Sequence, residues 1–146
     1  MTVFSPEVQA FVMGAEAALG RELPIVEAFG FGDSPQMADE LAALVLSGQK
    51  TATCGWPADL ALQEGSFSVM LNGQGAPLAV IETLELRAVP FLEVEAQFAY
   101  AEGEGDRTLE WWRDAHRHFF SHLPEGAAWN DGQVVQCERF RVVFAG

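Results

Sequence analysis

The stretch Leu46-Ser47-Gly48-Gln49-Lys50-Thr51-Ala52-Thr53 marks the point where a helix gives way to a strand. An apolar helical pattern precedes it, and Gly48 supplies the left-handed conformation that commonly ends a helix. The β-branched residues that follow favour an extended strand. Lys50 is the only lysine in the chain, and an amine, unlike a guanidinium, can change its protonation state when it is buried. A single amine beside two threonine hydroxyls is therefore the strongest functional lead in the sequence.

Two helices are predicted before the end of this stretch. Each begins with a serine followed by a proline, at Ser5-Pro6 and at Ser34-Pro35. The serine hydroxyl can cap the helix and the proline fits its first turn. Apolar residues then recur at helical spacing as far as Gly20 and Gly48. Residues 22–32 are expected to form a connecting loop with a short extended piece.

Strands dominate the second half of the chain. The pattern predicts strands over residues 51–56, 67–71, 77–87 and 133–144, a short helix over 91–100 and a long helix from Thr108 to about His122. No regular helix separates successive strands. The order therefore favours an α+β fold: a small, mainly antiparallel β-barrel or curled sheet with helices packed outside. We expect residues 1–146 to form one domain.

The composition is strongly acidic. The 146 residues carry 8 basic and 21 acidic side chains, which gives a formal net charge of −13. Such a field repels a phosphate backbone, so extensive binding of duplex nucleic acid is not expected, whereas a local pocket for a nucleoside or a short single strand is compatible with it. No segment resembles a signal peptide or a membrane span, and Cys54 and Cys137 indicate reduced, buried thiols. We therefore expect a cytoplasmic protein without a membrane partner; the oligomeric state stays open.

Several segments together resemble the ASCH family, the activating-signal-cointegrator homology domains, whose fold is a PUA-like β-barrel. Besides the stretch quoted above, they are Phe31-Gly32-Asp33-Ser34-Pro35, Phe98-Ala99-Tyr100-Ala101-Glu102-Gly103-Glu104-Gly105-Asp106, Thr108-Leu109-Glu110-Trp111-Trp112 and Cys137-Glu138-Arg139-Phe140. Each segment is weak alone, but they follow the family's order along most of the chain.

The resemblance implies an RNA-associated or hydrolytic activity. Some small members are similar to amidohydrolases that remove an acyl group from the exocyclic amine of modified cytidine, and others are known as ribonucleases. In the amidohydrolases the catalytic set is a lysine, a threonine three residues later and a downstream glutamate. By that resemblance the set falls on Lys50, Thr53 and Glu104, with Glu102 as an alternative for the glutamate. Gly55 stands where many members have an arginine, which weakens any expectation of phosphate binding there.

The alternation of side chains along a strand restricts how Lys50 and Thr53 can approach each other. On an ideal strand Thr51 and Thr53 share one face and Lys50 points to the other, so either the backbone bulges or the lysine stem bends back. A neutral Lys50 can then take a proton from Thr53 or from water, whereas a charged one can stabilise an oxyanion. Glu104 can carry a proton to the leaving amine, and its flanking glycines predict an adaptable loop. The sequence leaves the role of Lys50 open.

Further residues are predicted to bind the substrate around this centre. They are Thr51, Glu82, Tyr100, Glu102 and Trp111. Trp111 or Tyr100 would stack on a base. Glu82 lies on the apolar face of its strand, where it needs either an arginine partner or a role in a pocket.

The histidines of the long helix do not predict a metal site. Only His118 and His122 share a helix face, and no carboxylate signature adjoins them. We therefore expect neither a metal nor another cofactor. The leading hypothesis is a hydrolase of a small nucleoside-type amide. The alternatives are a non-catalytic RNA-binding module and a ribonuclease acting on short single-stranded RNA.

Overall fold

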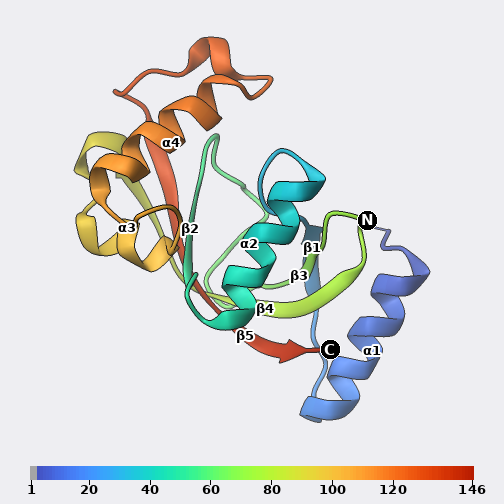
Figure 1. Cartoon of the computed structure of the whole chain (residues 1–146). Helices are drawn as coiled ribbons and strands as arrows, with labels where there is room; N and C mark the ends of the chain where they lie inside the picture. The colour runs from blue at the N-terminus through green and yellow to red at the C-terminus, as the bar shows by residue number, and fades with distance from the viewer. Residues whose placement is uncertain (1–2) are drawn as a thin grey trace.

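The computed structural model describes residues 3–146 (Figure 1). Its helices are α1 (Pro6–Leu19), α2 (Pro35–Ser47), α3 (Ala96–Glu102) and α4 (Leu109–Ser121), with the short 3-10 helices η1 (Phe91–Glu93) and η2 (Gly126–Ala128). Its strands are β1 (Ile25–Phe29), β2 (Ala52–Gly55), β3 (Phe67–Leu71), β4 (Pro77–Pro90) and β5 (Val134–Ala145). Within the described residues, no helix combines the length and the apolar character needed to cross a membrane.

The first two helices begin and end where the local sequence predicts. The Ser5 hydroxyl accepts a hydrogen bond from the Val8 N–H, and the Ser34 hydroxyl accepts one from the Met37 N–H. Gly48 ends α2 in the left-handed conformation, with a φ of 86°. These caps satisfy backbone groups that a helix terminus otherwise leaves without partners.

The five strands form one sheet in the order β1-β3-β4-β5-β2. β1 runs parallel to β3, and the other three neighbouring pairs are antiparallel. This confirms the α+β class and the mainly antiparallel sheet. The sheet is not closed into the expected barrel: in residues 3–146 its edges are β1 and β2, and a cavity lined by residues of both strands lies between them.

β1 is a full strand in a region expected to be mostly loop. Its five residues are all half-buried. The strand is short and lacks the alternation of buried and exposed side chains that marks a strand in sequence. It forms because β3 offers a free edge, so tertiary contacts rather than local propensity decide it.

Helices cover both faces of the sheet. Successive residues of a strand point to opposite faces, so Val69 packs toward α1 while Met70 packs toward α2. α3 and α4 lie at the other end of the sheet from α1, beside β2 (Figure 1). There Phe91, Phe98, Trp112 and Phe120 form a third apolar cluster with β2 and β5. The candidate site lies where this third cluster meets the cluster that Met70 forms with Phe31 and Leu41 beside α2.

Candidate active site

Lys50 lies between the end of α2 and the start of β2, and only 1% of its surface is exposed. Its backbone N–H donates to the Leu44 carbonyl at 3.1 Å, which anchors it to the last turn of α2. The side chain then turns back along the chain, and Nζ donates to the Ala52 carbonyl at 2.8 Å. Lys50 thus precedes the strand and its stem bends back, which is one of the two arrangements that strand alternation left open.

The Lys50 ammonium also contacts two carboxylates. Nζ lies 2.7 Å from Glu104 Oε2 and 3.0 Å from Glu102 Oε1. Burial lowers the pKa of Lys50, but the charges of Glu102 and Glu104 outweigh burial and hold the pKa above its ordinary value. Each of the three N–H groups of the ammonium has an oxygen partner, so Lys50 has no lone pair available to act as a base. The amine is charged in this structure.

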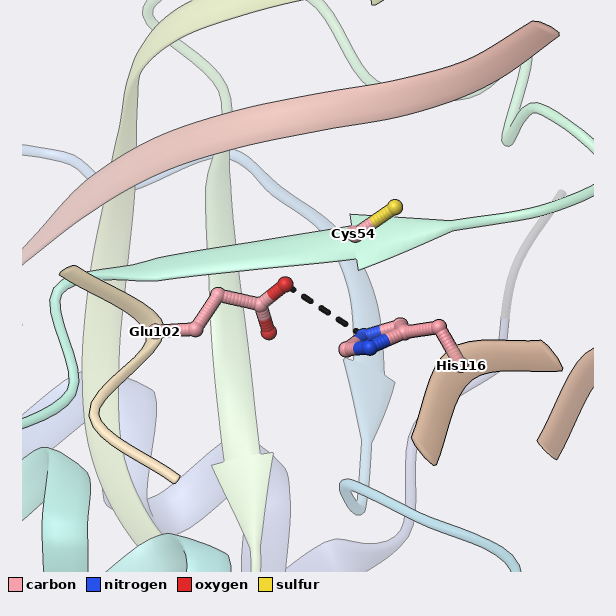
Figure 2. Close-up of side chains that lie close together, drawn as sticks. All are labelled: Cys54, Glu102 and His116. Carbon is pink, nitrogen blue, oxygen red and sulfur yellow. Dashed lines mark ion pairs between the residues drawn. The ribbon is translucent and has the colours of Figure 1, made fainter. Parts of the chain in front are cut away.

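Glu102 is the buried anchor of the cluster. Its Oε2 accepts a hydrogen bond from the Trp112 indole at 2.5 Å and lies 3.3 Å from His116 Nε2, toward which it points in Figure 2. Burial by itself raises the pKa of Glu102, but Lys50 and His116 lower it to about 2. Glu102 is therefore ionised at neutral pH, and donors occupy both of its oxygens.

His116 is held between two acceptors. Its Nδ1 lies 2.8 Å from the Trp112 carbonyl oxygen, and its Nε2 faces the Glu102 carboxylate. An imidazole donates to acceptors at both nitrogens only when each carries a hydrogen, so this arrangement favours the imidazolium form of His116. Burial lowers the pKa of His116, but the charge of Glu102 raises it above the ordinary value. The Lys50 ammonium, and His116 when it is protonated, thus balance the two carboxylates.

Glu104 differs from Glu102 in its surroundings. Its side chain is 13% exposed and lines the cavity described below. Burial raises the pKa of Glu104, Lys50 lowers it, and the neighbouring charge of Glu102 raises it again, with a net increase. Of the two carboxylates, Glu104 therefore binds a proton more readily and is the better proton carrier.

The loop that carries Glu104 packs closely against its neighbours. Gly103 has a φ of 72°, and a Cβ there would lie 2.5 Å from the Gln49 carbonyl oxygen. The Gln49 side chain also donates to the Gly103 carbonyl at 2.7 Å. At Gly105 a Cβ would collide with the Trp111 ring. These glycines thus allow close approach of the backbone to its neighbours, and the adaptable loop stays a prediction.

A cavity of about 430 Å³ opens onto this cluster. Lys50, Thr53, Glu102, Glu104 and Trp111 all line it, so the predicted catalytic residues and two predicted substrate-binding residues meet there. Most of the remaining lining is apolar: Phe31, Met37, Leu41, Cys54, Ala115 and Phe119. Charged groups at the base of a largely apolar cavity are typical of ligand sites.

Three predicted substrate-binding residues lie elsewhere. Thr51 is exposed, and its hydroxyl is 3.4 Å from the Ala101 carbonyl. Tyr100 is 58% exposed, with the Arg107 guanidinium 3.5 Å above its ring. None of the three lines the cavity just described.

Glu82 is the third of these residues. It forms an ion pair with Arg141, its partner in the β4–β5 register, at 2.8 Å. The arginine partner that the sequence left open is thus confirmed, and nothing places Glu82 in the pocket.

Sequence reasoning missed Trp112 and His116 as parts of the site. They lie four residues apart on α4, so they share one helix face, and both are buried there with Phe120. The spacing of Trp112, His116 and Phe120, each four residues from the next, was the available signal that this histidine is buried. It does not reveal which carboxylate the imidazole meets, since Glu102 arrives from a different helix.

Cys54, Glu102 and His116 bring possible metal-ligating atoms within 4.8 Å of one another (Figure 2). The chemistry of these groups does not fit a metal ion. Glu102 already accepts hydrogen bonds from Lys50 and Trp112, and the ammonium would repel a cation. Burial and the neighbouring Cys137 raise the pKa of the Cys54 thiol well above its ordinary value, whereas metal binding needs a thiolate.

Fold and site together define an α+β domain with a buried lysine held between two glutamates at a cavity. The family model of the ASCH domain matches residues 27–144. The chain therefore belongs to the ASCH domain family, as the sequence segments indicated.

Solved structures agree with this assignment. The ASCH domain from Lactobacillus crispatus JV V101 is 28% identical, with a TM-score of 0.88 over 98% of both chains. Protein EF3133 from Enterococcus faecalis V583 is 29% identical, with a TM-score of 0.83 over 96% of this chain and 94% of that one. The hypothetical protein PH0355 shares the fold alone. It is 14% identical, with a TM-score of 0.57 over 80% of this chain and 98% of that one. No curated protein matches the sequence.

Proposed function

We propose that this protein is a cytoplasmic hydrolase of a small nucleoside-type amide, in which an acyl group is carried on an exocyclic amine like that of cytidine. The observation that carries the proposal is the buried Lys50 ammonium, held by Glu102 and Glu104 at a cavity that Thr53 also lines. Burying ions is costly, and ionisable groups with perturbed pKa values beside a cavity are typical of catalytic sites.

Thr53 is the proposed nucleophile. Its Oγ1 attacks the acyl carbon, and its proton passes to the Glu104 carboxylate. The C–N bond then breaks, Glu104 gives the proton to the leaving amine nitrogen, and the acyl group stays on Thr53 as an ester. Water attacks this ester, Glu104 takes a proton from the water and returns it to Thr53 Oγ1, and the carboxylic acid leaves. One water is consumed for each amide cleaved.

Lys50 acts in this scheme as a charged group rather than as the base. The ammonium stabilises the oxyanion that develops on the acyl oxygen. In the resting site one of its N–H groups is held by Glu104. When Glu104 takes the proton of Thr53, its charge is lost and its hold on Lys50 weakens. The same N–H then becomes free to turn toward the oxyanion, so proton transfer and charge stabilisation are linked.

The RNA-directed alternatives receive less support from this site. The formal net charge is −13, so a phosphate group meets repulsion at long range, whereas at the cavity itself the Lys50 ammonium offsets the charges of Glu102 and Glu104. Neither carboxylate repels a neutral nucleoside. RNA binding without turnover and RNA cleavage are therefore competing outcomes of the experiment below.

The test is hydrolysis of N4-acetylcytidine, with a short single-stranded RNA assayed in parallel. Thr53→Val removes the hydroxyl while keeping the side-chain shape, and we expect kcat/KM to fall by about 10²-fold or more. Thr51→Val is the matched control, because Thr51 is the same residue type two positions away and lies outside the cavity. Turnover that survives Thr53→Val, or cleavage of RNA without cleavage of the amide, would overturn the proposal.

A further inference from the structure

A second cavity adjoins the first. It has a volume of about 220 Å³ and lies between the edge strands β1 and β2. Phe31, Gly32, Thr53 and Cys54 line both cavities, so the proposed nucleophile stands where the two meet. We call this space the acidic cavity, because Glu27, Asp59 and Glu138 line it and, among the described residues, no lysine or arginine does.

The three carboxyl groups come from separate parts of the chain. Glu27 is on β1, Asp59 is in the loop after β2, and Glu138 is on β5. Burial, and next to it the neighbouring Asp59 carboxyl, raise the pKa of Glu27 to about 7. Glu138 is buried and accepts the Thr83 hydroxyl at 2.7 Å.

Two backbone features build this arrangement. The Asp59 loop is held by Gln136, whose side chain accepts the Asp59 N–H at 3.1 Å and donates to the Asp59 carbonyl at 3.2 Å. The register of β1 against β3 shifts between Ile25 and Glu27. Such a bulge re-aims the side chains that follow it, and here it pairs Glu27 with Ser68 of β3.

Ser68 is the group that points to a ligand. It is 2% exposed and lines the acidic cavity, yet its hydroxyl has no hydrogen-bond partner within residues 3–146. A buried hydroxyl without a partner is costly, and native proteins rarely keep one without a reason. A bound molecule in the cavity supplies that reason, because the hydroxyl can both donate to it and accept from it.

We propose that the acidic cavity binds the hydroxyl- and amine-bearing, phosphate-free part of the substrate, while the first cavity holds the acyl group. The inference rests on the proposed function, since it takes Thr53 as the point of reaction. Carboxyl oxygens accept hydrogen bonds from sugar hydroxyls and from amine N–H groups, whereas they repel a phosphate. The apolar lining of the first cavity suits an acyl chain instead. The substrate class is therefore a nucleoside, not a nucleotide or an RNA.

Binding of the product nucleoside tests this inference without requiring turnover. Calorimetric titration would compare cytidine with cytidine 5′-monophosphate. We expect cytidine to bind at least about tenfold more tightly, a difference of ~1.4 kcal/mol. Glu138→Gln should narrow this preference, because it removes one negative charge from the cavity. Glu125→Gln is the matched control, since Glu125 is exposed and does not line the cavity.

Ser68→Ala gives a second, independent readout. We expect it to weaken cytidine binding several-fold without lowering the denaturation midpoint, because the hydroxyl that it removes has no partner in the protein. Unchanged cytidine binding in Ser68→Ala would overturn the inference. So would equal binding of the nucleoside and the nucleotide, an absence of cytidine binding at millimolar concentrations, or competition of Mg²⁺ with cytidine, which would mark a cation site.

Failure of this inference is distinguishable from failure of the proposed function. If the protein prefers cytidine but does not hydrolyse N4-acetylcytidine, the assignment of the acidic cavity stands and the proposed enzyme activity is wrong. If the protein hydrolyses N4-acetylcytidine but binds cytidine and cytidine 5′-monophosphate equally, the enzyme activity stands and the assignment of the acidic cavity is wrong.

Discussion

Lys50 Nζ and Glu102 Oε1 form an ion pair 3.0 Å long between two side chains that have almost no contact with solvent. A buried pair of this kind adds little net stability compared with apolar residues of the same volume, but removing one partner leaves an uncompensated buried charge. The pair is therefore a sensitive point of the fold as well as the centre of the proposed site.

Replacing Lys50 should destabilise the protein strongly. Lys50→Met keeps most of the unbranched side chain but leaves Glu102 without its main counter-charge, and we expect the free energy of unfolding to fall by about 3–5 kcal/mol. Urea denaturation would measure this. Arg141→Met is the control, because it breaks the exposed pair with Glu82, and its cost should stay below about 1 kcal/mol. Equal costs for the two variants would contradict the buried pair.

Substitutions of Glu102 and Glu104 should have different effects: the first should mainly lower stability and the second should mainly lower activity. Glu102→Gln removes the charge that Lys50 and His116 share, so we expect a large loss of stability at pH 7. The folded-state pKa of Glu102 is lowered from 4.5 to about 2, so its contribution is present above pH 4.5 and lost as the pH falls through about 2. The difference between wild type and Glu102→Gln should follow that course in unfolding experiments.

The matched change Glu104→Gln leaves Lys50 paired with Glu102. We expect it to cost less stability than Glu102→Gln, because the pKa of Glu104 is raised whereas that of Glu102 is lowered, and to lower amide turnover by about 10²-fold or more. Assays at saturating N4-acetylcytidine would measure turnover. A variant that unfolds like Glu102→Gln, or that keeps full activity, would show that the two carboxylates do not have the separate roles inferred from their burial.

His116 should stay protonated above the ordinary range of a histidine. Its folded-state pKa is raised from 6.5, so its contribution to stability is fully present below pH 6.5 and is lost as the pH rises through the folded-state pKa. The stability lost in His116→Gln, about 1–3 kcal/mol at pH 6, should shrink at higher pH. Nitrogen NMR of the imidazole ring would test this directly, and a neutral ring at pH 6.5 would contradict the ion pair with Glu102.

Gly103 should tolerate alanine less well than Gly48. Both have a positive φ, of 72° and 86°, so alanine is strained at either position. At Gly48 the added Cβ would have no atom of residues 3–146 within 4 Å apart from those of its chain neighbours, whereas at Gly103 the Gln49 carbonyl oxygen would lie at 2.5 Å. We expect Gly103→Ala to cost about 1–3 kcal/mol more in unfolding free energy and to lower activity, since it displaces Glu104. Similar costs would mean that the loop can move away.

Local sequence determined much of the fold. The serine caps and the terminal glycines placed α1 and α2, and alternating apolar residues placed β3, β4 and β5. These signals work because capping and periodicity act within a few residues of the chain. The spacing of Lys50 and Thr53, together with the family segments, also identified two residues that line the cavity.

Contacts between distant segments decided the rest. Glu102 is 52 residues from Lys50, and no local pattern could show that it, rather than Glu104, is the buried anchor. Cys54 and Cys137 look unrelated in sequence but face each other across β2 and β5. Contacts between separate strands also form β1, leave the sheet open between β1 and β2, and create the acidic cavity there. Burial and partners set the charge of an ionisable group, and these are properties of the packed chain rather than of any single segment.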